Sequence, residues 1–149
     1  MLRTIGIFMA SFAALATTGN AVGKPPVQFF QMPGTTKPFS HAVRVGDRVY
    51  VSGAVGYAAD GSLPTDFAIE TANAMDKIAA ELKMAGATMD DVYKCDVALT
   101  NMDQWAAFNE VYKTYFKPGR YPVRKATGVS SLRGPGVEVQ CEAYVGKGK

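Results

Sequence analysis

Apolar and polar residues alternate along two short segments, residues 42–45 and 48–52. Both segments are rich in valine, and the Gly46-Asp47 pair between them is typical of a tight hairpin turn. We therefore expect an antiparallel hairpin, followed by a third strand that begins near Val55. The preceding residues, 22–37, are rich in Pro, Gly and Thr, and we expect them to form an extended lead-in.

A helical period follows the hairpin. Over residues 65–85, apolar side chains recur every three or four positions and form one stripe, as in a helix packed on a core. Thr65 or Asp66 can cap its start and Gly86 can end it. A second helix is expected after Asn101 or Asp103, up to the Lys117-Pro118-Gly119 stop. Its apolar members are Trp105, Phe108, Val111, Tyr112 and Tyr115.

Three further segments read as strands: residues 92–99, 125–129 and 137–145. In the first, Tyr93, Cys95, Val97 and Leu99 share one face, opposite Lys94 and Asp96. In the last, Val137, Val139, Cys141, Ala143 and Val145 share one face, opposite Glu138, Gln140, Glu142 and Tyr144. The order βββαβαββ predicts an α+β fold, a mixed sheet with both helices on its apolar face. The charged face meets water, or a symmetric oligomer buries part of it and forms clefts between subunits.

The chain has 149 residues, enough for one domain with a core. Its first 21 residues have the form of a secretory signal peptide: a basic start, an uncharged apolar run over residues 5–16, and small residues up to Ala21. An uncleaved anchor or a buried helix is the alternative. We therefore expect a signal peptide over 1–21, a lead-in over 22–37 and one domain over 38–146, in a periplasmic or secreted protein without a membrane anchor after processing.

The charge and the metal-ligand inventory exclude several classes of site. Sixteen basic and thirteen acidic residues give a net charge of +3, and no basic stripe indicates nucleic-acid binding. One histidine, His41, and two cysteines cannot form a tetrahedral zinc site, and no Gly-x-Ser-x-Gly motif is present. We therefore expect chemistry without a metal and without a catalytic triad. Cys95 and Cys141 lie on the apolar faces of their strands, and we expect two buried free thiols, although an exported protein can also form a disulfide.

Seven short motifs occur in order along the domain: Pro38-Phe39-Ser40-His41-Ala42, Val51-Ser52-Gly53, Ala85-Gly86-Ala87, Leu99-Thr100-Asn101-Met102, Phe108-Asn109-Glu110-Val111-Tyr112, Pro122-Val123-Arg124 and Val137-Glu138-Val139-Gln140-Cys141-Glu142-Ala143. Over residues 33–145 they resemble the Rid family, the RidA-like reactive intermediate deaminases. The resemblance implies a chorismate-mutase-like fold and a homotrimer with three sites between subunits. It also implies cofactor-independent hydrolysis of enamines and imines, such as 2-aminoacrylate, to 2-keto acids and ammonia, the activity of a 2-iminobutanoate/2-iminopropanoate deaminase.

The resemblance also assigns site residues. Arg124 matches the family's substrate-binding arginine, whose planar fork suits the carboxylate of a 2-imino acid. Glu142 matches the water-positioning glutamate. Asn109, Ser52 and Phe39 match residues that surround the substrate. Without the motifs, the same residues read as a surface arginine, a solvated glutamate like Glu138, and ordinary helix, strand-end and loop residues.

Several positions depart from the family pattern and leave other functions open. Phe39 replaces a frequent tyrosine, Ala54 a glutamine, Ala126 a cysteine and Arg133 a proline. These changes affect the expected substrate preference and rate, but they keep Arg124 and Glu142. The alternatives are a non-catalytic trimer that binds small carboxylates or client proteins, and a ribonuclease. The ribonuclease alternative has less support, because the sequence shows no evident basic patch with stacking aromatic residues.

Overall fold

The computed structural model describes residues 23 and 25–146, so the expected signal peptide, residues 1–21, lies outside the described residues. The elements run in the order β1 (Val27–Phe30), β2 (Ala42–Val45), β3 (Arg48–Val51), β4 (Ala54–Val55), α1 (Phe67–Met84), β5 (Val92–Leu99), α2 (Trp105–Tyr112), β6 (Val123–Gly128) and β7 (Val137–Tyr144). Short 3-10 turns cover Met89–Asp91, Met102–Gln104 and Lys113–Tyr115. The expected mixed α+β fold is confirmed.

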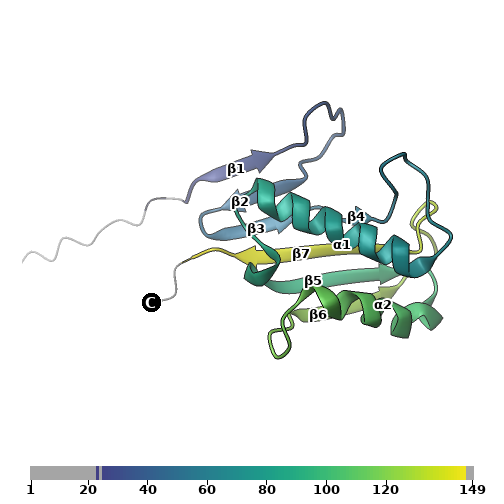
Figure 1. Ribbon diagram of the computed structural model, residues 1–149. Helices are drawn as coiled ribbons and strands as arrows, with labels where there is room; N and C mark the ends of the chain where they lie inside the picture. The colour runs from purple at the N-terminus through teal and green to yellow at the C-terminus, as the bar shows by residue number, and fades with distance from the viewer. Residues whose placement is uncertain (1–22, 24, 147–149) are drawn as a thin grey trace, which may run out of the picture.

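The strands form one mixed sheet in the order β1-β2-β3-β7-β5-β6 (Figure 1). Strands β5 and β6 are parallel, because α2 carries the chain back between them, and the other pairings are antiparallel. Strands β3 and β4 both pair with β7, and Ser52-Gly53 interrupts them. The sheet therefore has β7 and β5 at its centre and β6 at one edge.

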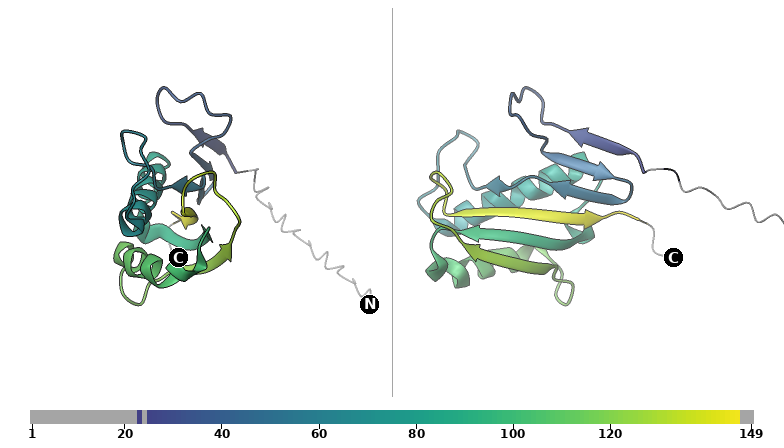
Figure 2. Two further views of the ribbon diagram at one scale, coloured as in Figure 1. Left: turned by 90° about the vertical axis from the view of Figure 1, so that its right-hand side faces the viewer. Right: turned by 180° about the vertical axis from the view of Figure 1, so that it is seen from behind.

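Both helices lie on the same side of the sheet, as the end-on view shows (Figure 2). The core between them and the sheet is formed by apolar side chains from both layers, of which Phe108, Met75 and Ile78 are the largest that are fully buried. In β7, Val137, Val139, Cys141 and Ala143 are almost fully buried, and the residues between them face away from the helices. The predicted alternation along this strand is thus confirmed.

Local capping fixes where α1 begins and ends. The side chain of Asp66 accepts a hydrogen bond of 2.7 Å from the backbone N–H of Ala68, as an N-cap residue does. After the helix, Gly86 has a φ of +78°, a left-handed conformation that glycine adopts without strain. The buried carboxylate of Glu70 accepts hydrogen bonds from the backbone N–H groups of Gly136 and Val137, at 2.6 and 3.2 Å. This contact joins the first turn of α1 to the start of β7.

The structure adds one strand to the predicted order. Strand β1 lies within the segment that we expected to be an extended lead-in, and it pairs antiparallel with β2, Phe29 lying opposite Val43. It is an edge strand, and the side chain of Phe29 is 71 % exposed. The segment therefore lacks the buried alternation by which a strand is recognised in a sequence.

A bulge in β5 changes the predicted face of one residue. The register between β5 and β7 shifts between Val92 and Lys94. Tyr93 is consequently exposed and its hydroxyl reaches Glu142, on the face away from the helices, so its predicted place on the apolar face is wrong. An extra residue in one strand resets the alternation, and the apolar series resumes at Cys95.

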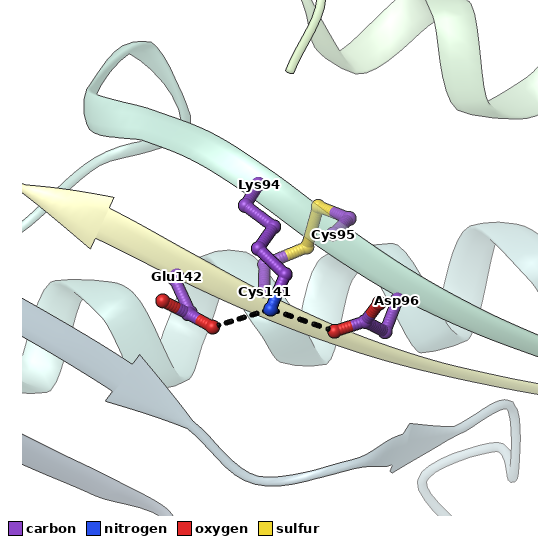
Figure 3. The surroundings of a disulfide bond; sticks show 5 residues. All are labelled: Lys94, Cys95, Asp96, Cys141 and Glu142. Atoms are coloured by element: carbon purple, nitrogen blue, oxygen red, sulfur yellow. Dashed lines mark hydrogen bonds and ion pairs between the residues drawn. A yellow bond between two sulfur atoms is a disulfide. The ribbon is translucent and has the colours of Figure 1, made fainter. Parts of the chain in front are cut away.

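The expectation of two free thiols is also wrong. Cys95 and Cys141 form a disulfide between directly opposed residues of β5 and β7, with their Cα atoms 4.1 Å apart (Figure 3). Both residues are buried on the helix-packed face. The pattern placed each cysteine on the correct face, but it left open the register that makes them partners.

Within residues 23 and 25–146, no helix has the length and apolar character needed to cross a membrane.

Candidate active site

Arg124 is held against α2 by a set of aromatic rings. It lies on the edge strand β6, beside Cys95 of β5, and its side chain lies over the helix-packed face. The guanidinium carbon is 4.9 Å from the ring centre of Trp105, 5.3 Å from that of Phe108 and 4.7 Å from that of Tyr112. Cations are attracted to the faces of such rings, so the arginine is positioned before any ligand arrives.

The spacing of residues along α2 explains this arrangement. Positions 105, 108, 109 and 112 are three or four residues apart and so share one face of the helix. The remaining member of this face, Asn109, accepts a hydrogen bond of 2.7 Å from Nη2 of Arg124. Asn109 therefore orients the guanidinium of Arg124.

Arg124 is a half-buried cation without an acidic partner. Among the residues that the structure describes, no carboxylate lies within 4.0 Å of its guanidinium. The guanidinium lines an open cleft of about 360 Å³, together with Asn109, Tyr112, Lys113, Tyr121 and Pro122. A planar guanidinium that faces a cleft without a counter-charge is suited to an anion, and best to a carboxylate, which can accept two parallel hydrogen bonds.

Tyr112 adds a group that the sequence did not identify. Its hydroxyl oxygen is buried and has no hydrogen-bond partner among the described residues, although the residue lines the same cleft. Burial raises the pKa of Tyr112 to about 12, against the opposing charge of Arg124, so the hydroxyl keeps its proton. The group is thus a hydrogen-bond donor. From the sequence, Tyr112 read only as an apolar member of the helix.

Glu142 occupies the other face of the sheet, where it is already bonded. It accepts a hydrogen bond of 2.6 Å from the hydroxyl of Tyr93. It also accepts a hydrogen bond of 2.8 Å from Lys94, which lies 3.1 Å from Asp96 as well (Figure 3). The hydrogen bond from Lys94, followed by that from Tyr93, holds the pKa of Glu142 below its usual range. The carboxylate is therefore ionised at neutral pH and can accept a further hydrogen bond from water.

One chain does not bring Arg124 and Glu142 together. Arg124 lies under α2 at the edge strand, whereas Glu142 lies on the opposite face of β7, with β5 between the two strands. The structure of one chain therefore does not form the expected Arg124–Glu142 pair.

Ser52 and Phe39, the two remaining residues expected at the site, lie apart from both Arg124 and Glu142. The hydroxyl of Ser52 donates a hydrogen bond of 2.8 Å to the carbonyl oxygen of Ser40. The ring of Phe39 is 46 % exposed, in the segment before β2. Next to Ser52, a Cβ atom on Gly53 would lie 1.9 Å from Oε1 of Glu138, so the absence of a side chain there leaves room for that carboxylate.

No metal-binding cluster is evident in the described part of the chain, since no three His, Cys, Asp or Glu side chains gather closely enough to hold an ion.

Comparison with known proteins adds independent evidence. A family model described as "Endoribonuclease L-PSP" matches residues 30–146. The chain is 38 % identical over 117 residues to a Mus musculus protein named 2-iminobutanoate/2-iminopropanoate deaminase, a match that covers 76 % of this chain and 86 % of the relative. A Homo sapiens protein of the same name is 34 % identical over 117 residues, with 76 % and 85 % covered.

A solved structure shares the fold. The crystal structure of RidA from the Antarctic bacterium Psychrobacter sp. PAMC 21119 aligns with a TM-score of 0.72 and 32 % identity. The alignment covers 79 % of this chain and 99 % of that one.

Proposed function

Since the chain belongs to the endoribonuclease L-PSP family, which includes RidA, we propose that it hydrolyses small 2-imino acids and their enamine tautomers to 2-keto acids and ammonia. Two relatives at 34–38 % identity bear the name of such a deaminase, which supports the reaction class. The observation that carries the proposal is the unpaired guanidinium of Arg124 in its aromatic and amide setting, facing a cleft.

In this proposal, Arg124 binds the carboxylate of the substrate. Only one of its five N–H donors is committed to Asn109, so the guanidinium can still donate two parallel hydrogen bonds. Tyr112 also lines the cleft, and its buried hydroxyl is a donor without a partner among the described residues, which a small local shift would bring to the substrate. These contacts fix the imine carbon relative to the protein, and positioning of this kind lowers the entropic part of the barrier.

The chemical step needs water, one proton acceptor and one proton donor. Water adds to the C=N carbon while one of its protons passes to the nitrogen, which gives a carbinolamine. The remaining hydroxyl proton then moves to the nitrogen as the C–N bond breaks, so that ammonia leaves and the C=O group forms. We assign the water-positioning role to Glu142, whose carboxylate is ionised because its pKa is lowered. Lys94 and Tyr93 also fix the orientation of the Glu142 carboxylate, because each donates a hydrogen bond to one of its two oxygens.

We further propose that the site is completed between chains in a homotrimer. Arg124, Glu142 and the pair Phe39 and Ser52 lie at three separate places on one chain, and a neighbouring copy can bring two of these places face to face. Sedimentation that gives a monomer at assay concentration would contradict this assembly. The deaminase proposal predicts that such a monomer has no activity.

Export remains a proposal that rests on two observations. Residues 1–21 have the pattern of a signal peptide, and the Cys95–Cys141 disulfide is typical of proteins from oxidising compartments. We therefore propose a periplasmic or secreted protein. Mass spectrometry of the protein recovered from the producing cells tests the cleavage of the signal peptide. A mass equal to that of the chain starting at Met1 would contradict cleavage.

The decisive experiment follows keto-acid formation from 2-iminopropanoate that a dehydratase generates in the assay. We expect the wild type to accelerate the reaction and Arg124→Lys to lose at least tenfold in kcat/KM, because a lysine cannot reproduce the planar fork. The matched control is Arg133→Lys, the same exchange at an exposed loop residue, which should keep full activity.

Two results would refute the proposal: no acceleration by the wild type, or equal acceleration by Arg124→Lys. Saturable binding of pyruvate without turnover would instead support the non-catalytic carboxylate-binding protein. A ribonuclease has less support, because Lys94 on the open face is already paired with Glu142 and Asp96 and is not free to bind phosphates.

A further inference from the structure

A second cavity shares no lining residue with the Arg124 cleft. It has a volume of about 180 Å³ and is enclosed by α1, the region around β4 and the segment that leads into β2. Its polar and aromatic lining includes Lys37, Phe39, His41, Tyr57, Lys77 and Glu81. Since one water occupies about 30 Å³ of liquid, the cavity has room for a small organic molecule.

Glu81 is a buried acid without a partner. The residue is only 5 % exposed, and its Oε2 atom has no hydrogen-bond partner among the described residues. Lys77, one helical turn earlier, does not pair with it, because its ammonium group donates to the carbonyl oxygens of Val55 and Tyr57 at 2.9 and 2.8 Å. A buried oxygen without a hydrogen-bond partner, such as Oε2 of Glu81, costs free energy. A ligand that donates a hydrogen bond to it would remove this cost.

Burial also sets the protonation of this acid. Desolvation raises the pKa of Glu81 to about 7, although the positive charges of Lys37 and Lys77 oppose the shift. A donor that enters the cavity would offset the desolvation and favour the ionised form.

The rest of the lining offers donors. The ammonium group of Lys37 lies 5.5 Å from the ring centre of Phe39 and has no carboxylate within 4.0 Å in the described chain. Lys77 commits two of its three protons to carbonyl groups, which leaves one. Nδ1 of His41 accepts a hydrogen bond of 3.2 Å from the backbone N–H of Met32, so in a neutral imidazole Nε2 carries the proton.

We propose that this cavity binds a small α-amino acid, with its ammonium group on Glu81 and its carboxylate on Lys37 and the free proton of Lys77. A simple cation would meet two lysines, and a simple anion would meet the carboxylate of Glu81. A molecule with both charges satisfies both sides of the cavity, and the volume restricts it to a small side chain. The site lies within one chain and does not use Arg124 or Glu142; it shares with the expected deaminase site only Phe39, which lines the cavity.

Nuclear magnetic resonance of the ¹⁵N-labelled, oxidised protein tests the site with glycine and L-alanine as probes. We expect saturable shifts of the backbone amides of Tyr57, Lys77 and Glu81. Propionate, which lacks the ammonium group, and ethylammonium, which lacks the carboxylate, should each bind at least tenfold more weakly. Glu81→Gln should weaken alanine binding at least tenfold, whereas the matched control Glu110→Gln, an exposed acid on α2, should not change it.

Three outcomes would overturn the proposal: no saturable shift at these amides, unchanged affinity in Glu81→Gln, or loss of binding in Arg124→Lys, which would place the amino acid in the other cleft. One measurement needs no variant. The carboxyl carbon of Glu81 in the wild type is titrated with pH, with and without alanine, while Lys37, Lys77, His41 and Tyr57 are the charged or titratable groups that face it. The proposal requires the probe to lower the pKa of Glu81, and an unchanged pKa would contradict it.

Discussion

Breaking the Cys95–Cys141 disulfide should strongly destabilise this protein. The bond closes a loop of 46 residues. A cross-link of this span reduces the conformational entropy of the unfolded chain, and the chain-entropy relation gives about 4 kcal/mol at 25 °C. For a domain of this size, that loss corresponds to a fall in the melting temperature of about 10–16 °C.

The measurement compares urea unfolding of the oxidised protein with that of protein reduced in denaturant and refolded under a reductant, at one protein concentration. The double variant Cys95→Ala/Cys141→Ala is the control: it should be close to the reduced wild type in stability, and the reductant should not change its midpoint. Thiol titration of the denatured protein should find no free thiol before reduction and two after it. Equal midpoints for oxidised and reduced protein would refute the reasoning, as would two free thiols in protein recovered from an oxidising medium.

Three further predictions address single side chains. Glu70→Ala should reduce the free energy of unfolding by roughly 3 kcal/mol in urea titrations, because it leaves the N–H groups of Gly136 and Val137 unpaired, whereas Glu110→Ala at an exposed site should have little effect. Tyr112→Phe should leave stability nearly unchanged, since the hydroxyl has no partner in the free protein, but should weaken pyruvate binding by calorimetry about tenfold; unchanged binding would exclude the hydroxyl from the site. Because the folded pKa of Glu142 is lowered, its contribution to stability is present above the unfolded pKa and lost as pH falls through the folded value, so wild-type stability should fall more steeply than that of Glu142→Gln from pH 6 to pH 3.

The sequence predicted the fold well where burial is one-sided. The alternation in residues 137–144 gave the correct buried face of β7, and the three- and four-residue spacing gave α1, because in both elements one face meets the core. The prediction failed in segments that do not bury one face in a regular alternation. Strand β1 has exposed side chains, and the bulge at Tyr93 breaks a period of two that sequence reading assumes to continue.

The site was predicted only in part, for a related reason. Motifs identified Arg124 and Asn109, and the structure joins them by a hydrogen bond. The contact of Arg124 with the rings of Trp105 and Tyr112 was not predicted, because in a sequence an aromatic stripe on a helix indicates a core. The pairing of the cysteines depends on the register between β5 and β7, which strands 46 residues apart do not reveal. Likewise, Glu81 lacks an ion pair with Lys77 because the ammonium group of Lys77 donates to backbone carbonyl oxygens instead. No sequence pattern predicts that choice of partner.

The position of the disulfide also affects how the protein matures. Strand β7 is the last strand among the described residues, so Cys141 is synthesised after nearly all of the domain, and the bond can close only then. A shift of one residue between β5 and β7 would turn the two sulfurs toward opposite faces of the sheet and prevent their union. Formation of this disulfide therefore depends on strand alignment. The Cys95–Cys141 bond can form only in molecules whose central strands, β5 and β7, are paired in the correct register.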